Sequence, residues 1–144
     1  MNTPYLVPYL TFDGNCREAM SFYQQCLGGE LMIQPFADTP AAEYLPANAT
    51  ADSVLHASLT NGDLLLFGSD SGGQQVTAGN SVSISINCGS ETQIADWFEK
   101  LSAGGNVTMP LGDTFWGATF GMFTDRFGIA WMLNYDKVPV EQPV

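Results

Sequence analysis

The chain has 144 residues, of which 45% are hydrophobic and 12% aromatic, enough apolar content for one folded domain or two small fused modules. Fifteen acidic residues face four basic ones, and the net charge of -11 disfavours nucleic acids and anionic membrane surfaces as partners. No apolar run approaches the roughly 20 residues that span a bilayer, and the first residues show no basic, apolar leader, so a cytoplasmic location is expected.

The first half predicts one helix and four strands. Residues 8–12 form a short apolar strand, and Asp13-Gly14-Asn15 after it is typical of a turn that caps a helix. Apolar residues recur at helical spacing over 16–27, and Gly28-Gly29 ends this helix. Further strands are expected at 30–36, 53–59 and 64–69, with a long loop at 37–52 and a hairpin turn at Asn61-Gly62.

The second half begins after residues 69–79, a Gly/Ser/Gln-rich stretch typical of a flexible linker. Residues 81–86 alternate between serine and an apolar residue, which predicts a half-buried strand. A helix is expected over 91–103, and Gly104-Gly105 ends it. The remaining strands are expected at 106–111, 116–124 and 129–135, with a turn at 125–128 between the last two.

The two halves repeat each other. A shift of 76 residues places Ala19 on Ala95, Phe22 on Phe98 and the first double glycine on the second. Each half reads strand, helix, double glycine, strand, hairpin. The sequence therefore predicts two units of βαβββ type.

Five stretches carry a family pattern that covers nearly the whole chain. The longest is residues 15–29, Asn-Cys-Arg-Glu-Ala-Met-Ser-Phe-Tyr-Gln-Gln-Cys-Leu-Gly-Gly; the others are residues 9–16, His56-Ala57-Ser58-Leu59, Thr114-Phe115-Trp116-Gly117 and residues 125–132. Together they resemble the vicinal oxygen chelate superfamily, which includes glyoxalase I, bleomycin-resistance proteins and extradiol dioxygenases. Within it they are most similar to the PhnB-like branch, also described as a 3-demethylubiquinone methyltransferase-like domain.

The resemblance implies an α+β fold in which two βαβββ modules with curved mixed sheets enclose a cleft, commonly in a homodimer. It makes residues 1–144 a single PhnB-like domain, with modules at about 4–70 and 80–137 joined by the Gly/Ser/Gln-rich linker. A low content of charged residues, 13%, leaves surface for a subunit interface.

Metal-using members of the superfamily place His, Gln or Glu on the first and last strands of each module. On this chain those positions fall on Pro8, on Phe67 or its neighbours Leu66 and Gly68, on Ser81, Ser83 or Ser85, and on Met132. Proline and phenylalanine do not bind a divalent cation, serine is a poor ligand and methionine suits soft metals only. We therefore expect no conventional metal site and no cofactor.

His56 is the only histidine, and a histidine recurs at this place in the superfamily. On a strand it shares a face with Ser58. It either points into the cleft, as a general acid or base or as part of an unconventional metal site, or is hydrogen-bonded within the sheet. Among the carboxylates Asp70 is the best metal candidate, although turn capping explains it equally well.

The three cysteines form no CxxC pair and are expected to be reduced thiols. Cys26 falls in the apolar helical pattern and is expected to be buried and inert. Cys16 stands at a helix start, where thiol pKa values can fall, but only Arg17 next to it would activate it, so we expect it to be unreactive.

Trp116 lies in an expected turn or bulge, where it either stacks on a planar ligand at the cleft mouth or packs within the protein or a dimer interface. No Lys or Arg falls on a predicted cleft strand, which favours a neutral or cationic, partly aromatic ligand over a phosphate or carboxylate.

Three functions stay open: a small-molecule-binding protein without a metal, an enzyme that uses His56, and a module whose cleft has closed and whose role is association. The expected ligand-binding residues are Tyr9, His56, Phe67, Trp116 and Met132, and His56 is the candidate catalytic residue.

Overall fold

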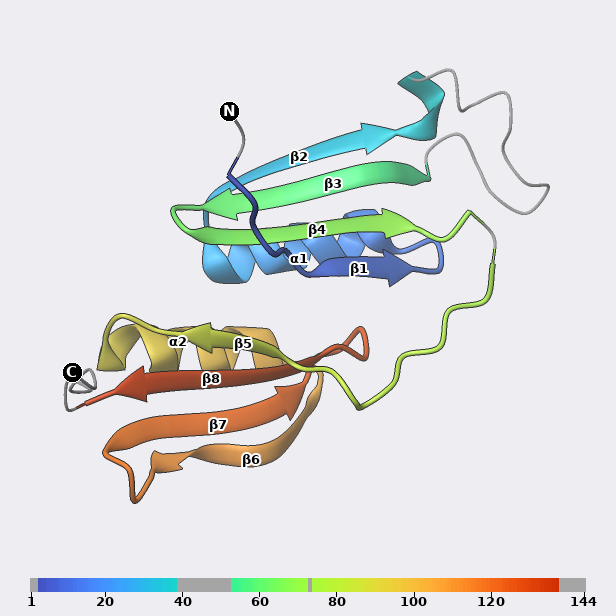
Figure 1. Ribbon diagram of the computed structural model, residues 1–144. Coiled ribbons are helices and arrows are strands. Elements are labelled where there is room, and N and C mark those ends of the chain that lie inside the picture. Colours follow the sequence, from blue (N-terminus) through green and yellow to red (C-terminus); the bar gives the residue numbers. More distant parts are fainter. Residues whose placement is uncertain (1–2, 39–52, 73, 138–144) are drawn as a thin grey trace. The chain divides into compact units, whose positions relative to one another are not determined.

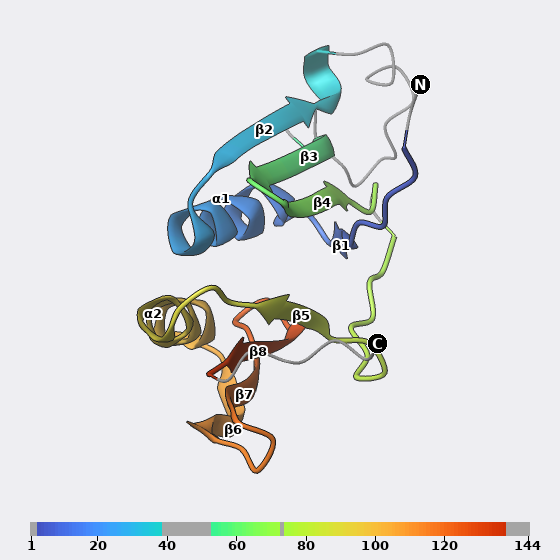
Figure 2. The ribbon, with the colours of Figure 1, turned by 60° about the vertical axis from the view of Figure 1, so that its left-hand side comes forward.

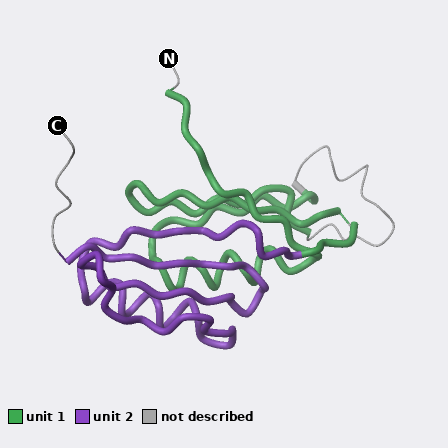
Figure 3. The backbone as a smooth tube through the Cα atoms, turned by 60° about the horizontal axis from the view of Figure 1, so that its bottom comes forward, with its two compact units in different colours: residues 1–77 green, residues 78–144 purple. Residues whose placement is uncertain are grey.

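The computed structural model describes residues 3–38, 53–72 and 74–137. The chain divides into two compact units, residues 1–77 and 78–144, coloured separately in Figure 3. The boundary between them falls inside the expected linker. Most of the expected loop at 37–52 lies outside the described residues. No helix among the described residues is long and apolar enough to cross a membrane.

Unit 1 is one helix packed on a four-stranded mixed sheet (Figure 1). Its strands run in the order β1-β4-β3-β2, with β1 parallel to β4 and the other pairs antiparallel. The elements are β1 (Tyr9–Phe12), α1 (Cys16–Leu27), β2 (Glu30–Pro35), a 3-10 turn (Phe36–Asp38), β3 (Val54–Asn61) and β4 (Leu64–Asp70).

Unit 2 repeats this arrangement. Its sheet has the order β5-β8-β7-β6, with β5 parallel to β8 and the rest antiparallel. The elements are β5 (Ile84–Asn87), α2 (Glu91–Ser102), β6 (Asn106–Asp113), β7 (Ala118–Thr124) and β8 (Ala130–Asp136). The α+β class and the two βαβββ units are therefore confirmed.

In each unit the helix covers one face of its own sheet (Figure 2). In unit 1 the buried face of α1 includes Met20 and Tyr23, and the sheet presents Ala57 and Leu59 from β3 to the core. Alternate residues of each strand point to the other face, because side chains alternate along a strand. That second face, opposite the helix, is where His56 and Phe67 lie.

The double glycines occupy the same structural position in both units. A Cβ atom on Gly29 would lie 2.3 Å from the carbonyl oxygen of Thr60, and one on Gly105 would lie 2.2 Å from that of Thr124. The chain leaving each helix therefore passes directly against the end of a hairpin strand, which only glycine permits. This close approach is the physical reason for the repeated glycine.

The helices themselves are offset by 75 residues, not 76. The buried residues Ala19, Tyr23 and Cys26 of α1 correspond to Ile94, Phe98 and Leu101 of α2. Ala95, the expected partner of Ala19, is exposed. One additional residue, Ala103, separates α2 from its double glycine. The shift of 76 residues therefore aligns the double glycines correctly, but its pairing of Ala19 with Ala95 and of Phe22 with Phe98 was wrong.

Two strand predictions also need correction. The strand expected at 81–86 begins only at Ile84. Its partner β8 begins at Ala130, which the register places opposite Ser83, so residues 81 and 82 have no residue of β8 to pair with. The strand expected at 116–124 begins at Ala118. Trp116 lies instead in the tight turn between β6 and β7, which Thr114 closes by accepting a hydrogen bond from the Ala118 N–H on its Oγ1 (3.1 Å).

Candidate functional site

An aromatic cluster lies on the face of the unit 1 sheet opposite α1. Tyr9 on β1 is directly opposite Phe67 on β4, and Phe67 is directly opposite Ser58 on β3, two residues from His56. The His56 and Phe67 rings meet edge to face, with centroids 4.9 Å apart, and Tyr9 meets Phe67 edge to face at 6.1 Å. Aromatic pairs prefer this geometry. Three predicted ligand-binding residues are thus brought together, and His56 shares the face of Ser58 as expected.

The polar ends of Tyr9 and His56 also meet. The Tyr9 hydroxyl oxygen lies 3.3 Å from His56 Nδ1, and the two ring centroids are 5.8 Å apart. Tyr9 remains half exposed. The cluster therefore combines apolar ring surface with a polar edge, the composition typical of small-molecule sites.

A hollow of about 420 Å³ borders the cluster on the side of the edge strand β2. Its lining residues are Met32, Ile33, Gln34, Pro35, His56 and Ser58. Gln34 is directly opposite His56 across β2 and β3, and the register shifts by one residue immediately after this pair. Leu55 is the extra residue of β3 at this bulge, so Val54 and Ala57 are both buried while His56 lies on the face opposite α1.

Sequence reasoning missed the polar members of this hollow, Gln34 and Ser58. The signal was present for Ser58, which follows His56 by two residues on the same strand. Gln34 was not recognisable, because its place opposite His56 depends on the register of β2 against β3. These strands are separated in sequence by residues 36–53, and no short hairpin turn fixes their register.

The equivalent face of unit 2 carries three methionines in its middle and polar residues, among them Asn87 and Asn134, towards one end. Ser85, Met132, Met122 and Met109 stand directly opposite one another in turn across β5, β8, β7 and β6. Phe120, two residues before Met122, contacts the ring of Trp116 edge to face with centroids 6.0 Å apart. Trp116 and Met132 therefore border one apolar surface of unit 2.

The residues at the expected metal positions do not fit a divalent cation. The first-strand residue opposite Phe67 is Tyr9 and not Pro8, because β1 begins at Tyr9. Its counterpart in unit 2, opposite Met132, is Ser85. No group of three or more His, Cys, Asp or Glu side chains that could hold a metal occurs among the described residues.

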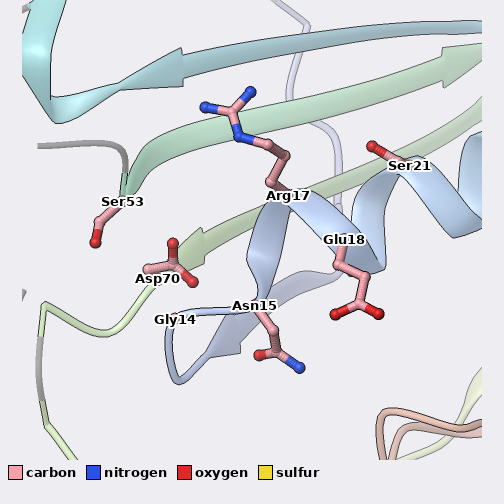
Figure 4. A pocket seen from close by; sticks show the side chains of 7 residues that line it. All are labelled: Gly14, Asn15, Arg17, Glu18, Ser21, Ser53 and Asp70. Atoms are coloured by element: carbon pink, nitrogen blue, oxygen red, sulfur yellow. The ribbon is translucent and has the colours of Figure 1, made fainter. Parts of the chain in front are cut away.

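Asp70 has a structural role. Its buried carboxylate accepts hydrogen bonds from the backbone N–H of Cys16 on one oxygen (2.9 Å) and from that of Val54 on the other (2.8 Å). Figure 4 shows Asp70 beside the first turn of α1, with Arg17 and Glu18 projecting from the helix. Both carboxylate oxygens thus join the start of α1 and the start of β3 to the end of β4.

The buried cysteines are poor nucleophiles. Burial raises the pKa of the Cys16 thiol to about 12; the nearby Asp70 carboxylate contributes and Arg17 partly offsets it. Burial alone raises the pKa of Cys88 to about 11. Only the thiolate is nucleophilic, so the helix start does not activate Cys16 and the expectation of an unreactive thiol is supported. Cys26 is buried, as expected.

Of the four Lys and Arg residues, only Arg17 belongs to unit 1, the unit that holds the aromatic cluster. Lys100 pairs with Asp96, Arg126 donates to the carbonyl oxygen of Ala103, and Lys137 pairs with Asp113 and Glu91. Arg17 lines a separate hollow at the start of α1 (Figure 4). Neither the cluster nor the hollow at β2 is lined by a cation.

Residues 4–134 match the family model described as 3-demethylubiquinone-9 3-methyltransferase. The chain belongs to this family. Protein YjdN of Escherichia coli strain K12 is 32% identical over 142 residues, covering 92% of this chain and 95% of that protein.

Solved structures agree with this assignment. Protein PA1353 from Pseudomonas aeruginosa is 46% identical, with a TM-score of 0.82 over 93% of this chain and 98% of that one. A Bacillus cereus protein described as a putative 3-demethylubiquinone-9 3-methyltransferase, PhnB protein, is 26% identical, with a TM-score of 0.74 over 92% and 99%. The resemblance to the PhnB-like branch is confirmed.

A solved structure of much lower sequence identity has a similar fold. A glyoxalase/bleomycin resistance protein/dioxygenase family enzyme from Burkholderia phytofirmans PsJN is 13% identical, with a TM-score of 0.60 over 90% of this chain and 96% of that one. This shows the fold shared with that superfamily.

Proposed function

We propose that this protein binds a small, planar, partly aromatic molecule, neutral or cationic, without the help of a metal ion. The observation that carries the proposal is the cluster of the Tyr9, His56 and Phe67 rings on the sheet face opposite α1, beside a hollow of about 420 Å³. Ring surface next to a few polar groups favours a flat ligand that stacks and also forms hydrogen bonds.

The charge distribution supports a ligand that is not anionic. An anionic group in a binding site needs Arg, Lys or a metal to offset its lost hydration. The residues that line the hollow at β2 include no Lys or Arg, Arg17 of the same unit lines a separate hollow, and the net charge of -11 repels anions at long range. The family description names 3-demethylubiquinone, an uncharged ring compound, which agrees with this ligand class.

A charge series of similar probes tests the proposal: 2-acetylnaphthalene, 2-naphthyltrimethylammonium and naphthalene-2-sulfonate. Calorimetric titration should show the first two binding and the sulfonate binding at least about tenfold more weakly, the effect of one uncompensated charge. Phe67→Ala should weaken binding by about 1 kcal/mol or more through the lost ring contact. Tyr5→Ala is the control, because Tyr5 is an aromatic side chain that is 67% exposed.

The same titration tests whether ligand binding requires a metal ion. Protein dialysed against a chelator should bind 2-acetylnaphthalene unchanged, since Phe67 and Met132 occupy the expected metal positions. Stoichiometric zinc, nickel or manganese in the purified protein, lost in His56→Ala, would contradict this part of the proposal. Equal affinity for the sulfonate would contradict the ligand class.

A second candidate function is acid–base catalysis by His56. The observation that favours it is the Tyr9–His56 contact. In the tautomer in which Nδ1–H donates to the Tyr9 oxygen, Nε2 keeps its lone pair and is available as a general base. If His56 acts as a base, the protein in D2O should exchange the methyl protons of bound 2-acetylnaphthalene for deuterium faster than buffer alone does. His56→Ala should lower the exchange rate to that of the buffer. Exchange at the buffer rate with the native protein would exclude this activity for the probe.

Trp116 and Met132 define a second candidate ligand surface, in unit 2. Trp116 is 54% exposed, whereas Trp131 is buried. A planar probe on this surface should quench the fluorescence of Trp116, and Trp116→Ala should remove that response without unfolding the protein. Quenching that survives the substitution, or a substitution that mainly unfolds the protein, would assign Trp116 to packing instead.

A further inference from the structure

The contact between Tyr9 and His56 decides which ring nitrogen faces the hollow. The Tyr9 oxygen lies 3.3 Å from Nδ1, at the long end of the hydrogen-bond range. A neutral imidazole has one N–H and one nitrogen lone pair. The phenol O–H is the better donor of the two groups and the imidazole nitrogen the better acceptor, so the favoured arrangement has Tyr9 donating to Nδ1. The ring proton then lies on Nε2, and His56 acts as a hydrogen-bond donor.

Gln34 stands next to that donor. It lies directly opposite His56 on the neighbouring strand, on the same sheet face, and both side chains line the hollow. Residues so paired have Cβ atoms about 5 Å apart. The Gln34 amide offers an oxygen acceptor and an N–H donor side by side. The edge of the hollow therefore presents an N–H donor from His56 and an oxygen acceptor from Gln34 within reach of one small group.

We infer that this edge recognises a planar lactam, a flat ring that carries a carbonyl oxygen next to a ring N–H. The carbonyl oxygen accepts from His56 Nε2, the ring N–H donates to Gln34 Oε1, and the ring lies against the aromatic cluster. A lactam is uncharged, which matches a site with no lining cation. The inference rests on the proposed function and narrows its ligand class.

Three probes of nearly equal shape separate the hydrogen bonds. 2-Quinolone has both the carbonyl and the N–H; N-methyl-2-quinolone keeps the carbonyl alone; 2-methoxyquinoline has neither. Calorimetric titration should place 2-quinolone about threefold to tenfold tighter than the N-methyl compound, the range for one neutral hydrogen bond, and the methoxy compound weakest.

Two substitutions assign the bonds to residues. Gln34→Leu should lower the affinity for 2-quinolone to that for N-methyl-2-quinolone while leaving the affinity for the N-methyl compound unchanged. Tyr9→Phe should weaken both carbonyl probes about twofold to fivefold, since it frees Nδ1 to take the proton, and should spare 2-methoxyquinoline. Gln25→Leu on the exposed side of α1 and Tyr5→Phe, at an exposed position, are the matched controls.

A spectroscopic readout tests the role of Tyr9 independently of affinity. Because the chain has a single histidine, the imidazole region of a ¹H–¹⁵N spectrum of tag-free protein reports His56 alone. The Nε2–H form should dominate in the native protein, and Tyr9→Phe should admit the Nδ1–H form. A merely structural role for Tyr9 would leave the tautomer unchanged.

The outcomes separate this inference from the proposed function. Equal binding of all three quinoline probes, all weakened by Phe67→Ala, would overturn the lactam inference and leave the aromatic site standing. A dominant Nδ1–H form in the native protein would also overturn it. Failure of every neutral probe, the naphthalene series included, would overturn both.

Discussion

At the residue scale, the two double glycines carry the tightest backbone constraint of the fold. Gly29 has a φ of 94°, a conformation that L-residues rarely adopt, and a Cβ atom there would meet the Thr60 carbonyl. Gly105 has no room either, because its Cβ would lie 2.2 Å from the Thr124 oxygen. Both contacts are with backbone, which cannot rotate away as a side chain does.

Alanine at either position should therefore destabilise the protein strongly. We expect Gly29→Ala and Gly105→Ala each to lower the free energy of unfolding by about 3 kcal/mol or more, because the hairpin strand must shift to admit a methyl group. Gly79→Ala is the control, since open space surrounds that position. Urea denaturation measures the difference; a loss below about 1 kcal/mol at Gly29 would show that the close approach relaxes freely.

The Cys16 thiol makes stability depend on pH in the alkaline range. Its pKa is about 12 in the folded chain against an ordinary value of 9.0, so the folded state holds the proton more tightly. The resulting stabilisation is fully present below about pH 9 and is lost as the pH rises towards 12. Cys16→Ala should flatten this decline in urea denaturation between pH 8 and about pH 11, and the raised pKa values of Cys88 and Lys137 should leave part of the decline in place.

Alkylation gives a second measure of the same thiol. Native protein at pH 8 should react with iodoacetamide at Cys16 far more slowly than protein unfolded in urea, because burial keeps the thiol protonated. Mass spectrometry of the modified peptide measures the two rates. Rapid modification of Cys16 in folded protein would contradict the raised pKa.

At the element scale, one buried carboxylate in each unit joins segments that the sheet ladder leaves separate. Asp70 receives the first N–H groups of α1 and β3. Asp125 closes the turn between β7 and β8 by accepting from the backbone N–H of Phe127 and Ile129, and its other oxygen accepts from the Trp131 indole N–H (2.8 Å). Each carboxylate satisfies several buried donors at once.

Replacing Asp70 by Asn should cost about 1–3 kcal/mol of unfolding free energy, because an amide nitrogen cannot accept from the second N–H group. Asp63→Asn, in the exposed turn between β3 and β4, should cost less than about 0.5 kcal/mol. Urea denaturation of both variants measures the contrast. If instead Asp70→Asn kept its stability and lost a bound divalent cation, Asp70 would be a metal ligand.

Local patterns predicted the helices and the hairpins well. The helix expected at 16–27 has those bounds, and the turns at Gly62 and Gly128 have φ values of 59° and 88°, as expected for glycine there. The start of β5 was not predictable, because it depends on where the partner strand β8 begins. The offset between the helices was missed because one additional residue, Ala103, follows α2.

The candidate site was predictable in part. Tyr9, His56 and Phe67 were found from the resemblance and strand alternation, and the structure places them in contact. Gln34 was missed because no local sequence pattern gives the register of β2 against β3. Trp116 and Met132 share a surface of unit 2, and their part in ligand binding stays a prediction.

At the scale of the whole molecule, each sheet ends in two edge strands among the described residues, β1 and β2 in unit 1 and β5 and β6 in unit 2. Large hydrophobic side chains stand exposed on three of them: Tyr9 on β1, Met32 on β2, and Val107 and Met109 on β6. Open edges with apolar side chains favour association of chains. The opposing factor is charge, because two chains of net charge -11 repel each other.

Apolar contacts at the edge strands and repulsion between the net charges together predict a homodimer whose stability rises with salt concentration. Added salt screens the repulsion between the chains, with a Debye length of about 8 Å at 0.15 M, and leaves the apolar contact intact. Light scattering at micromolar concentration should give about twice the chain mass of 15.5 kDa, and the dissociation constant should fall as sodium chloride is raised from low to physiological concentration.

Placing a charge on an edge strand should separate the chains. Met109→Lys on β6 is expected to weaken the dimer at least about tenfold, because a lysine buried without a partner loses its hydration. Thr92→Lys, at an exposed position on α2, makes the same change in net charge and is the control. A mass near 15.5 kDa for the unaltered chain at every salt concentration would exclude the dimer. A dimer that Met109→Lys leaves intact would move the interface away from β6.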